Sequence, residues 1–249
     1  MVDVASLLVV AGTFLIAGSV KGVIGLGLPP VSLALLTVAL DLPTAMALML
    51  IPSFVTNIWQ SMVGGNARAI LVRLWPFLVM ATLTVWIGAA ALTRVNLSYL
   101  TLLLGSLLII YAVVNLAGIR MVVASRHEVW AGPLIGSVNG VLTGMTGSFA
   151  VPGVMFLQAI GLSRNMLIQA MGMLFTVSTV ALAAALQQAN FLTVEHGAVS
   201  AVAVVPALAG MVLGQRIRER LSERVFRNVF FISLLILGIY IMVNALQKF

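Results

Sequence analysis

A lysine within a glycine-rich stretch is the first feature of this 249-residue chain that could do chemistry. Lys21 lies in an apolar region beside Gly22, Gly25 and Gly27, and two prolines follow at positions 29 and 30. Glycine and proline weaken helices, and a charge at the centre of a bilayer costs about 2.5–3.5 kcal/mol. In a membrane, this combination predicts a broken helix at a binding site, with Lys21 as the counter-charge for an anion. The alternative is that Lys21 reaches the membrane interface at the end of its helix.

A second glycine-rich stretch carries hydroxyl groups. Thr143, Thr146 and Ser148 stand beside Gly144 and Gly147. These hydroxyls could bind the oxygens of an oxyanion, or could donate to carbonyls of their own helix. Their grouping within a glycine-rich break favours a site.

The two stretches belong to an internal repeat. Residues 18–23 match residues 136–141 at five of six positions, which aligns Lys21 with Asn139, an amide that donates hydrogen bonds without a charge. Shorter matches follow in the same order near residues 97 and 221, and near 110 and 239. The conserved order predicts a duplicated chain.

Two further amides lie in the apolar segments that follow the breaks. Asn57 and Gln169 are predicted to contact substrate, although hydrogen bonding between helices explains them equally well. The complete set of predicted substrate-binding residues is Lys21, Gly22, Gly25, Gly27, Asn57, Asn139, Thr143, Gly144, Thr146, Gly147, Ser148 and Gln169. No catalytic residue, metal ligand or cofactor is expected.

The composition indicates a polytopic membrane protein. Hydrophobic residues make up 62% of the chain and charged residues 8%, too few charges for the surface of a soluble domain. The absence of cysteine excludes disulfides and thiolate metal sites. The first four residues lack a basic region, so we expect no cleaved signal peptide. The net charge of +7 comes from residues between apolar segments, which argues against a nucleic-acid partner.

The apolar segments define an all-α fold. They run over residues 4–20, 28–40, 43–62, 71–92, 97–117, 129–146, 149–161, 163–186, 196–215 and 225–246. Segments 28–40 and 149–161 have thirteen residues each, fewer than the roughly 20 that span a bilayer. We therefore predict two inverted repeats, each with a glycine- and proline-broken helical hairpin plus three full transmembrane helices. The repeats cover residues 1–118 and 129–249, and a cytoplasmic loop, 119–128, connects them.

The loop charges favour one orientation. Counting each broken region as one helix separates the basic residues seven against five. Counting it as two segments places ten on one side, against Arg94 and Lys248 on the other, which fits the positive-inside rule much better. The ten are Arg68, Arg73, Arg120, Arg126, Arg164, Arg216, Arg218, Arg220, Arg224 and Arg227. This count predicts a cell inner-membrane protein with both termini outside and the 216–227 loop in the cytoplasm. Re-entrant hairpins and pairs of short crossings fit it equally.

No enzyme signature is present. The chain lacks a His-Glu-x-x-His zinc motif, a Gly-x-Ser-x-Gly elbow and a Walker A phosphate loop. All six acidic residues fall at segment ends or in loops, so no carboxylate relay through the membrane is expected.

The order of segments, with a glycine-rich stretch ending in proline in each half, resembles the sulfite exporter TauE/SafE family. The resemblance rests on residues 18–30 and 136–152, each followed by a helix rich in small and polar residues, 45–57 and 169–179. The chain departs from the usual consecutive glycines by having Gly25-Leu26-Gly27-Leu28, and it carries Lys21 and Asn139. The resemblance implies a permease for sulfite, a sulfonate or a related organosulfur anion.

Three functions follow from these features. The first is a secondary carrier or facilitator that moves a small anion through a midplane site formed by the two broken helices. The second is an anion channel on the same scaffold, and the third is a membrane assembly factor without transport activity. The expected partners are the anion, the lipid bilayer and a possible homodimer.

Overall fold

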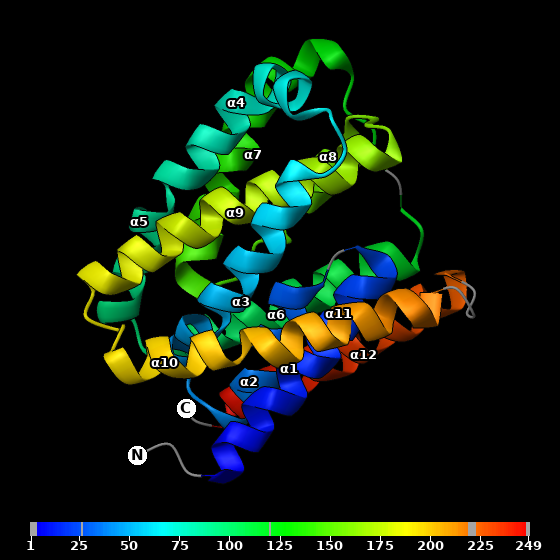
Figure 1. Ribbon diagram of the computed structural model, residues 1–249. Helices are drawn as coiled ribbons and strands as arrows, with labels where there is room; N and C mark the ends of the chain where they lie inside the picture. Colours follow the sequence, from blue (N-terminus) through cyan, green and yellow to red (C-terminus); the bar gives the residue numbers. More distant parts are fainter. Residues whose placement is uncertain (1–3, 26, 120, 219–222, 248–249) are drawn as a thin grey trace. The chain divides into compact units, whose positions relative to one another are not determined.

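The computed structural model describes residues 4–25, 27–119, 121–218 and 223–247, which contain helices and no strand. Figure 1 shows their order. The helices are α1 (Val4–Ile24), α2 (Leu28–Ala39), α3 (Leu42–Met62), α4 (Ala67–Leu83), α5 (Val85–Ala89), the 3-10 helix η1 (Ala90–Thr93), α6 (Leu97–Leu116), α7 (Ser125–Thr146), α8 (Gly153–Ala159), α9 (Arg164–Gln188), α10 (Val194–Val202), α11 (Val204–Arg218) and α12 (Glu223–Leu246).

The all-α prediction is confirmed, and the helix starts have local causes. Asn96 accepts a hydrogen bond from the Ser98 N–H (2.9 Å) and caps α6. Thr193 caps α10 in the same way through the His196 N–H (3.1 Å). Such side chains satisfy backbone donors that have no partner within the helix.

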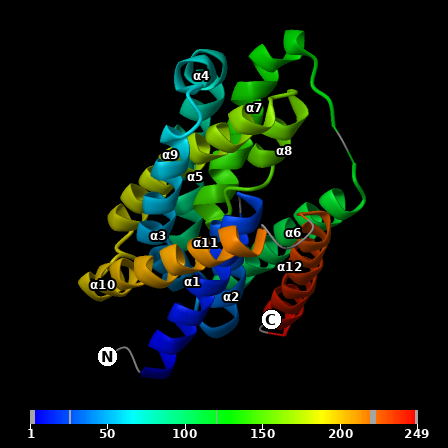
Figure 2. The same cartoon turned by 45° about the vertical axis from the view of Figure 1, so that its right-hand side comes forward.

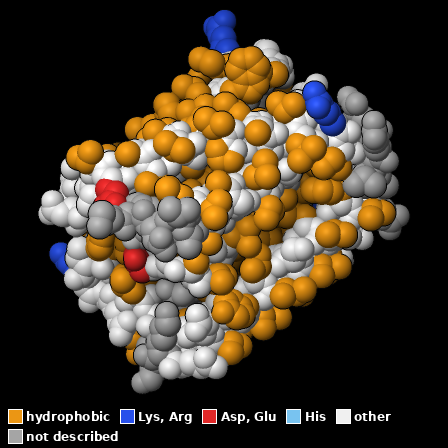
Figure 3. All heavy atoms as spheres, turned by 60° about the horizontal axis from the view of Figure 1, so that its bottom comes forward, with side chains coloured by type: hydrophobic (Ala, Val, Ile, Leu, Met, Phe, Trp, Pro, Cys, Tyr) orange, Lys and Arg blue, Asp and Glu red, His pale blue; other side chains and the backbone are white. Residues whose placement is uncertain are grey.

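Seven helical segments among the described residues are long and apolar enough to cross a membrane. They are Leu7–Ile24, Leu42–Met62, Ala67–Thr93, Leu97–Leu116, Arg164–Gln188, Val194–Arg218 and Val225–Leu246. Many of their large apolar side chains are exposed, and Figure 3 shows one face on which hydrophobic side chains are widespread and charged ones few. Such a surface suits lipid rather than water, so the chain is a multi-pass membrane protein.

The chain divides into two compact units that each combine distant parts of the sequence. Unit 1 comprises residues 1–52, 96–118 and 191–249, and unit 2 comprises residues 53–95 and 119–190. The boundary between residues 52 and 53 falls within α3. Each unit contains residues from both predicted repeats. The duplication of the chain stays a prediction from the order of motifs in the sequence. Of the residues in the charge count, Arg120, Arg220 and Lys248 lie outside the described residues.

In unit 1, α1 packs closely along α11. A Cβ placed on Gly18 would meet the backbone carbonyl of Ala207, and one on Gly22 would meet the carbonyl of Met211. Gly210 and Gly214 of α11 approach α1 in the same way. Small residues spaced four apart let two helix backbones approach in a membrane.

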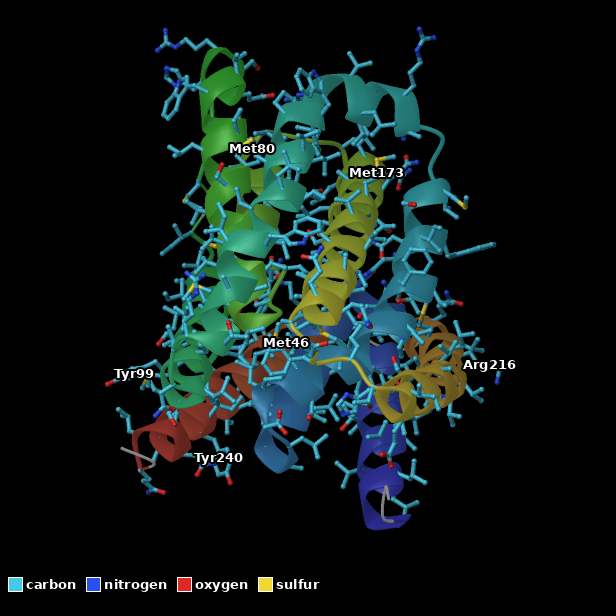
Figure 4. The ribbon with its side chains drawn as sticks, turned by 90° about the vertical axis from the view of Figure 1, so that its left-hand side faces the viewer. Met46, Met80, Tyr99, Met173, Arg216 and Tyr240 are labelled. Atoms are coloured by element: carbon cyan, nitrogen blue, oxygen red, sulfur yellow. The ribbon has the colours of Figure 1, made fainter. Side chains whose placement is uncertain are left out.

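The same unit pairs α6 with α12, which lie side by side in Figures 1 and 2. Gly105 and Gly238 face each other there, since a Cβ on either would lie about 3 Å from the carbonyl oxygen of the other. The first turn of α6 and the last turns of α12 together line a cavity of about 240 Å³, so the two helices are antiparallel. Tyr99 and Tyr240 lie at this end of the pair (Figure 4).

In unit 2, α7 packs closely against α4 and α5, as α1 packs against α11 in unit 1. A Cβ on Gly136 would meet the carbonyl of Phe77, and one on Gly144 would meet the carbonyl of Val85. The Arg73 side chain donates to both carboxylate oxygens of Glu128 (2.8 and 2.7 Å) and to the Ile160 carbonyl (2.9 Å). This clamp ties α4 to the start of α7 and to the end of α8.

The close contact of α1 with α11 makes Gly18 intolerant of a side chain. We expect Gly18→Ala to lower the stability of the detergent-solubilised protein by about 1–3 kcal/mol, because the added methyl would collide with backbone rather than with a movable side chain. Gly12→Ala is the matched control on the same helix, since no atom lies within 4 Å of a Cβ there. Thermal unfolding of both variants measures the effect, and equal melting temperatures would contradict this packing.

Candidate functional site

The first break lies between α1 and α2 in unit 1. Gly25 and Gly27 have positive φ values of 81° and 115°, a region in which a side chain is strained. The Gly25 N–H donates to the Lys21 carbonyl (2.8 Å), and the Val31 N–H donates to the Gly27 carbonyl (3.0 Å). Leu26 lies outside the described residues. The glycines therefore supply the backbone turn that a helix break requires.

Lys21 and Gly22 lie within α1, not in the break itself. The segment expected to end at residue 20 continues to Ile24, because the glycines at 18 and 22 serve the contact with α11. Lys21 is 4% exposed and is the sole charged residue among the buried side chains that the structure describes. It precedes the break by one helical turn.

The second break lies between α7 and α8 in unit 2 and is closed by side chains. Gly147 caps α7 with a φ of 73°, and its N–H donates to the Thr143 carbonyl (2.7 Å). The Thr143 hydroxyl donates to the Ser148 carbonyl (3.1 Å), and the Ser148 N–H donates to the Thr146 hydroxyl oxygen (3.2 Å). Thr143, Thr146 and Ser148 are all buried. The structure thus brings these predicted residues together, and their hydrogen bonds serve the backbone.

Asn139 connects α7 to the start of α8. Its Oδ1 accepts a hydrogen bond from the Gly153 N–H (2.8 Å), and the residue is fully buried. Its Nδ2 has no hydrogen-bond partner among the described residues. The amide oxygen therefore satisfies a backbone N–H, and the amide nitrogen remains available as a donor.

Gly144 and Gln169 have clear structural roles. Gly144 lies in α7 against α5, where a Cβ would also come within 2.5 Å of the Ala89 N. Gln169 donates to the Ser61 carbonyl (2.9 Å) and accepts from the Asn66 N–H (2.9 Å), which holds α9 to the end of α3. Asn57 is fully buried on α3.

Two serines in unit 2 were not among the predicted site residues. Ser53 on α3 and Ser178 on α9 are fully buried, and neither Oγ has a hydrogen-bond partner among the described residues. Sequence alone gives little signal for them, since most hydroxyls in apolar helices donate to a carbonyl of the preceding turn. Only the bonding pattern of the folded chain distinguishes them.

The breaks can offer hydrogen bonds, and Lys21, one turn before the first break, can offer a positive charge. In the part of the chain that the structure describes, no group of three His, Cys, Asp or Glu side chains could hold a metal ion. The cavity between α6 and α12 is lined by none of the predicted site residues. What the buried polar residues share is hydrogen-bond donation, which suits an anion with acceptor oxygens.

Comparison with known proteins identifies a family. A family model described as sulfite exporter TauE/SafE matches residues 10–241, which include both breaks. No curated protein and no solved structure matches the chain. On the family match, this multi-pass membrane protein belongs to the sulfite exporter TauE/SafE family of transporters.

Proposed function

We propose that the protein is a permease that moves a small oxyanion, such as sulfite, a sulfonate or a related organosulfur anion, across the cell inner membrane. The observation that carries this proposal is the burial of Lys21 one turn before a helix break. A buried ammonium group is stabilised by an anion beside it. No other charged residue is buried among the described side chains, so Lys21 is the candidate for the charge-balancing group.

The two breaks carry different groups. Pro29 and Pro30 occupy the first turn of α2 and carry no N–H, so Leu28 alone offers a backbone donor among the first three residues of that helix. The first break therefore acts chiefly through the charge of Lys21. The second break acts through neutral donors, of which Asn139 Nδ2 is the available one.

The lengths of the short helices favour re-entrant hairpins over pairs of short crossings. Helix α8 has seven residues and α2 has twelve, which correspond to about 10 and 18 Å, against a hydrocarbon core of about 30 Å. The longer arms, α1 and α7, have 21 and 22 residues. The order of long, short, long, interrupted and long helices is the same in both halves, which supports the proposed repeats. Inversion of the repeats and movement of one against the other complete the proposed carrier mechanism.

An anion channel on the same scaffold is the competing function. A counterflow measurement distinguishes a carrier from a channel, because substrate on the far side accelerates uptake by a carrier but not by a channel. A non-transporting assembly factor would show neither activity. Paired breaks with a buried lysine favour transport over that third function.

Removal of the Lys21 charge tests the proposed site. We expect Lys21→Met to reduce anion uptake into proteoliposomes at least tenfold, because the counter-charge is lost, while Lys21→Arg retains part of the activity. Uptake is measured with sulfite, a sulfonate and a carboxylate. Thermal unfolding provides the control, since an apolar side chain of similar length should keep this buried position folded. Undiminished uptake by folded Lys21→Met would exclude the role of Lys21.

The proposed hairpins make a topological prediction that single cysteines can test, since the natural chain has none. In Arg164→Cys and Arg94→Cys, the two exposed positions are expected on opposite sides of the membrane, with residue 94 outside. A membrane-impermeant maleimide should label residue 94 in intact cells and residue 164 only after permeabilisation. Arg68→Cys provides the internal reference for the cytoplasmic side. Labelling of residues 94 and 164 from the same side would show that α7 and α8 together cross the membrane once.

A further inference from the structure

Ser178 departs from the bonding rule that its neighbours on α9 follow. The Thr176 hydroxyl donates to the Gly172 carbonyl (2.7 Å), and the Thr179 hydroxyl donates to the Phe175 carbonyl (2.6 Å). Ser178 lies between them, is fully buried, and has no partner for its Oγ among the described residues. A buried hydroxyl without a hydrogen bond lowers stability, so a persistent one calls for a cause.

Asn139 presents a second donor of the same kind. The hydrogen bond from the Gly153 N–H to Oδ1 fixes the orientation of the amide, which leaves the Nδ2 hydrogens as its free end. That Nδ2 is buried and has no partner in the described part of the chain. Asn139 Nδ2 and Ser178 Oγ are therefore two buried donors, on different helices of unit 2, that have no acceptor among the described residues.

Both donors lie on helices that meet at the second break. A Cβ on Gly153 would lie 2.6 Å from Asn139 Oδ1 and 3.0 Å from Leu174 Cδ2, so α7 and α9 meet at this glycine. Ser178 lies one helical turn beyond Leu174 on the same face of α9. The ring of Phe149, in the break, packs on Phe175 with the centroids 5.8 Å apart.

The first half of the chain carries an equivalent hydroxyl. Ala45-Met46-Ala47 precedes Ser53 by the same spacing at which Ala170-Met171-Gly172 precedes Ser178. Ser53 is likewise fully buried, with no partner for its Oγ in the described residues. A chance packing defect would not be expected at corresponding positions of both halves.

We infer that Ser178 is a substrate-binding residue, whose hydroxyl joins Asn139 Nδ2–H in a neutral hydrogen-bonding site for the transported oxyanion. The inference rests on the proposed function and adds Ser178, with Ser53 as its counterpart, to the residues that would line the path. The class of ligand follows from the chemistry, because both groups can donate to the several oxygens of a sulfite- or sulfonate-like anion. Neutral donors hold an anion less firmly than a cation does, which allows its release during transport.

The variant Ser178→Ala separates binding from folding. We expect the KM for methanesulfonate or sulfite uptake into proteoliposomes to rise about tenfold, with Vmax little changed. The melting temperature should stay the same or rise, because the substitution removes a hydroxyl that makes no hydrogen bond in the folded protein.

Ser200→Ala is the matched control, a buried serine of unit 1 whose hydroxyl is fully used. Ser200 Oγ donates to the Leu48 carbonyl (2.8 Å) and accepts from the Ile51 N–H (3.2 Å). Its removal should lower the melting temperature and leave the KM unchanged, the reverse of the result for Ser178.

Three outcomes would contradict the inference in different ways. An unchanged KM in Ser178→Ala, with active wild-type protein, overturns the binding role of Ser178 alone. A lower melting temperature together with an unchanged KM assigns Ser178 to packing. Wild-type protein that takes up neither anion nor any other oxyanion tested overturns the proposed function itself, and the inference with it.

Discussion

The structure depends on one constraint, which is that every backbone group released by a helix break must find a partner inside the protein. No water is available in the core of a bilayer to satisfy such groups, and each unsatisfied one costs several kcal/mol. The two breaks of this chain meet the constraint differently. The first places Pro29 and Pro30 at the start of α2, which removes the donors that would need partners. The second uses the side chains of Asn139, Thr143 and Thr146 as partners for the backbone.

This difference accounts for the composition of the breaks without reference to a substrate. The polar residues of the second break partner two backbone N–H groups and one backbone carbonyl. The first break has fewer N–H groups to satisfy because Pro29 and Pro30 carry none. Polar residues near a break are therefore weak indicators of binding when taken one by one. A stronger indicator is the polar atom that remains once the backbone has been satisfied, such as Asn139 Nδ2 or Ser178 Oγ.

The sequence predicted the fold well because the helices depend on local signals. Apolar segments and their lengths gave nearly all helix positions, and both breaks were found from glycine and proline. The role of several glycines could not be predicted, since Gly22 and Gly144 are glycine for contacts with helices far away in the sequence. The repeated motif at residues 18–23 and 136–141 therefore serves helix packing, and it also precedes a break in each half. Gln169 was predicted to contact substrate because it lies in the apolar segment that follows a break. Its hydrogen bonds with Ser61 and Asn66 emerge only from the folded chain.

The same glycine contacts bear on how a lysine can be held inside the membrane. Gly18 and Gly22 flank Lys21 on α1 and bring that helix against the backbone of α11, so Lys21 lies on one member of a closely packed helix pair. The break begins one turn later, where Gly25 and Gly27 allow the backbone to reverse. Close packing on one side and a glycine turn on the other hold the charge beside the break. A helix that frayed at Gly22 would instead let Lys21 extend toward the interface, so the tight contact with α11 is what makes an interior role for this lysine physically reasonable.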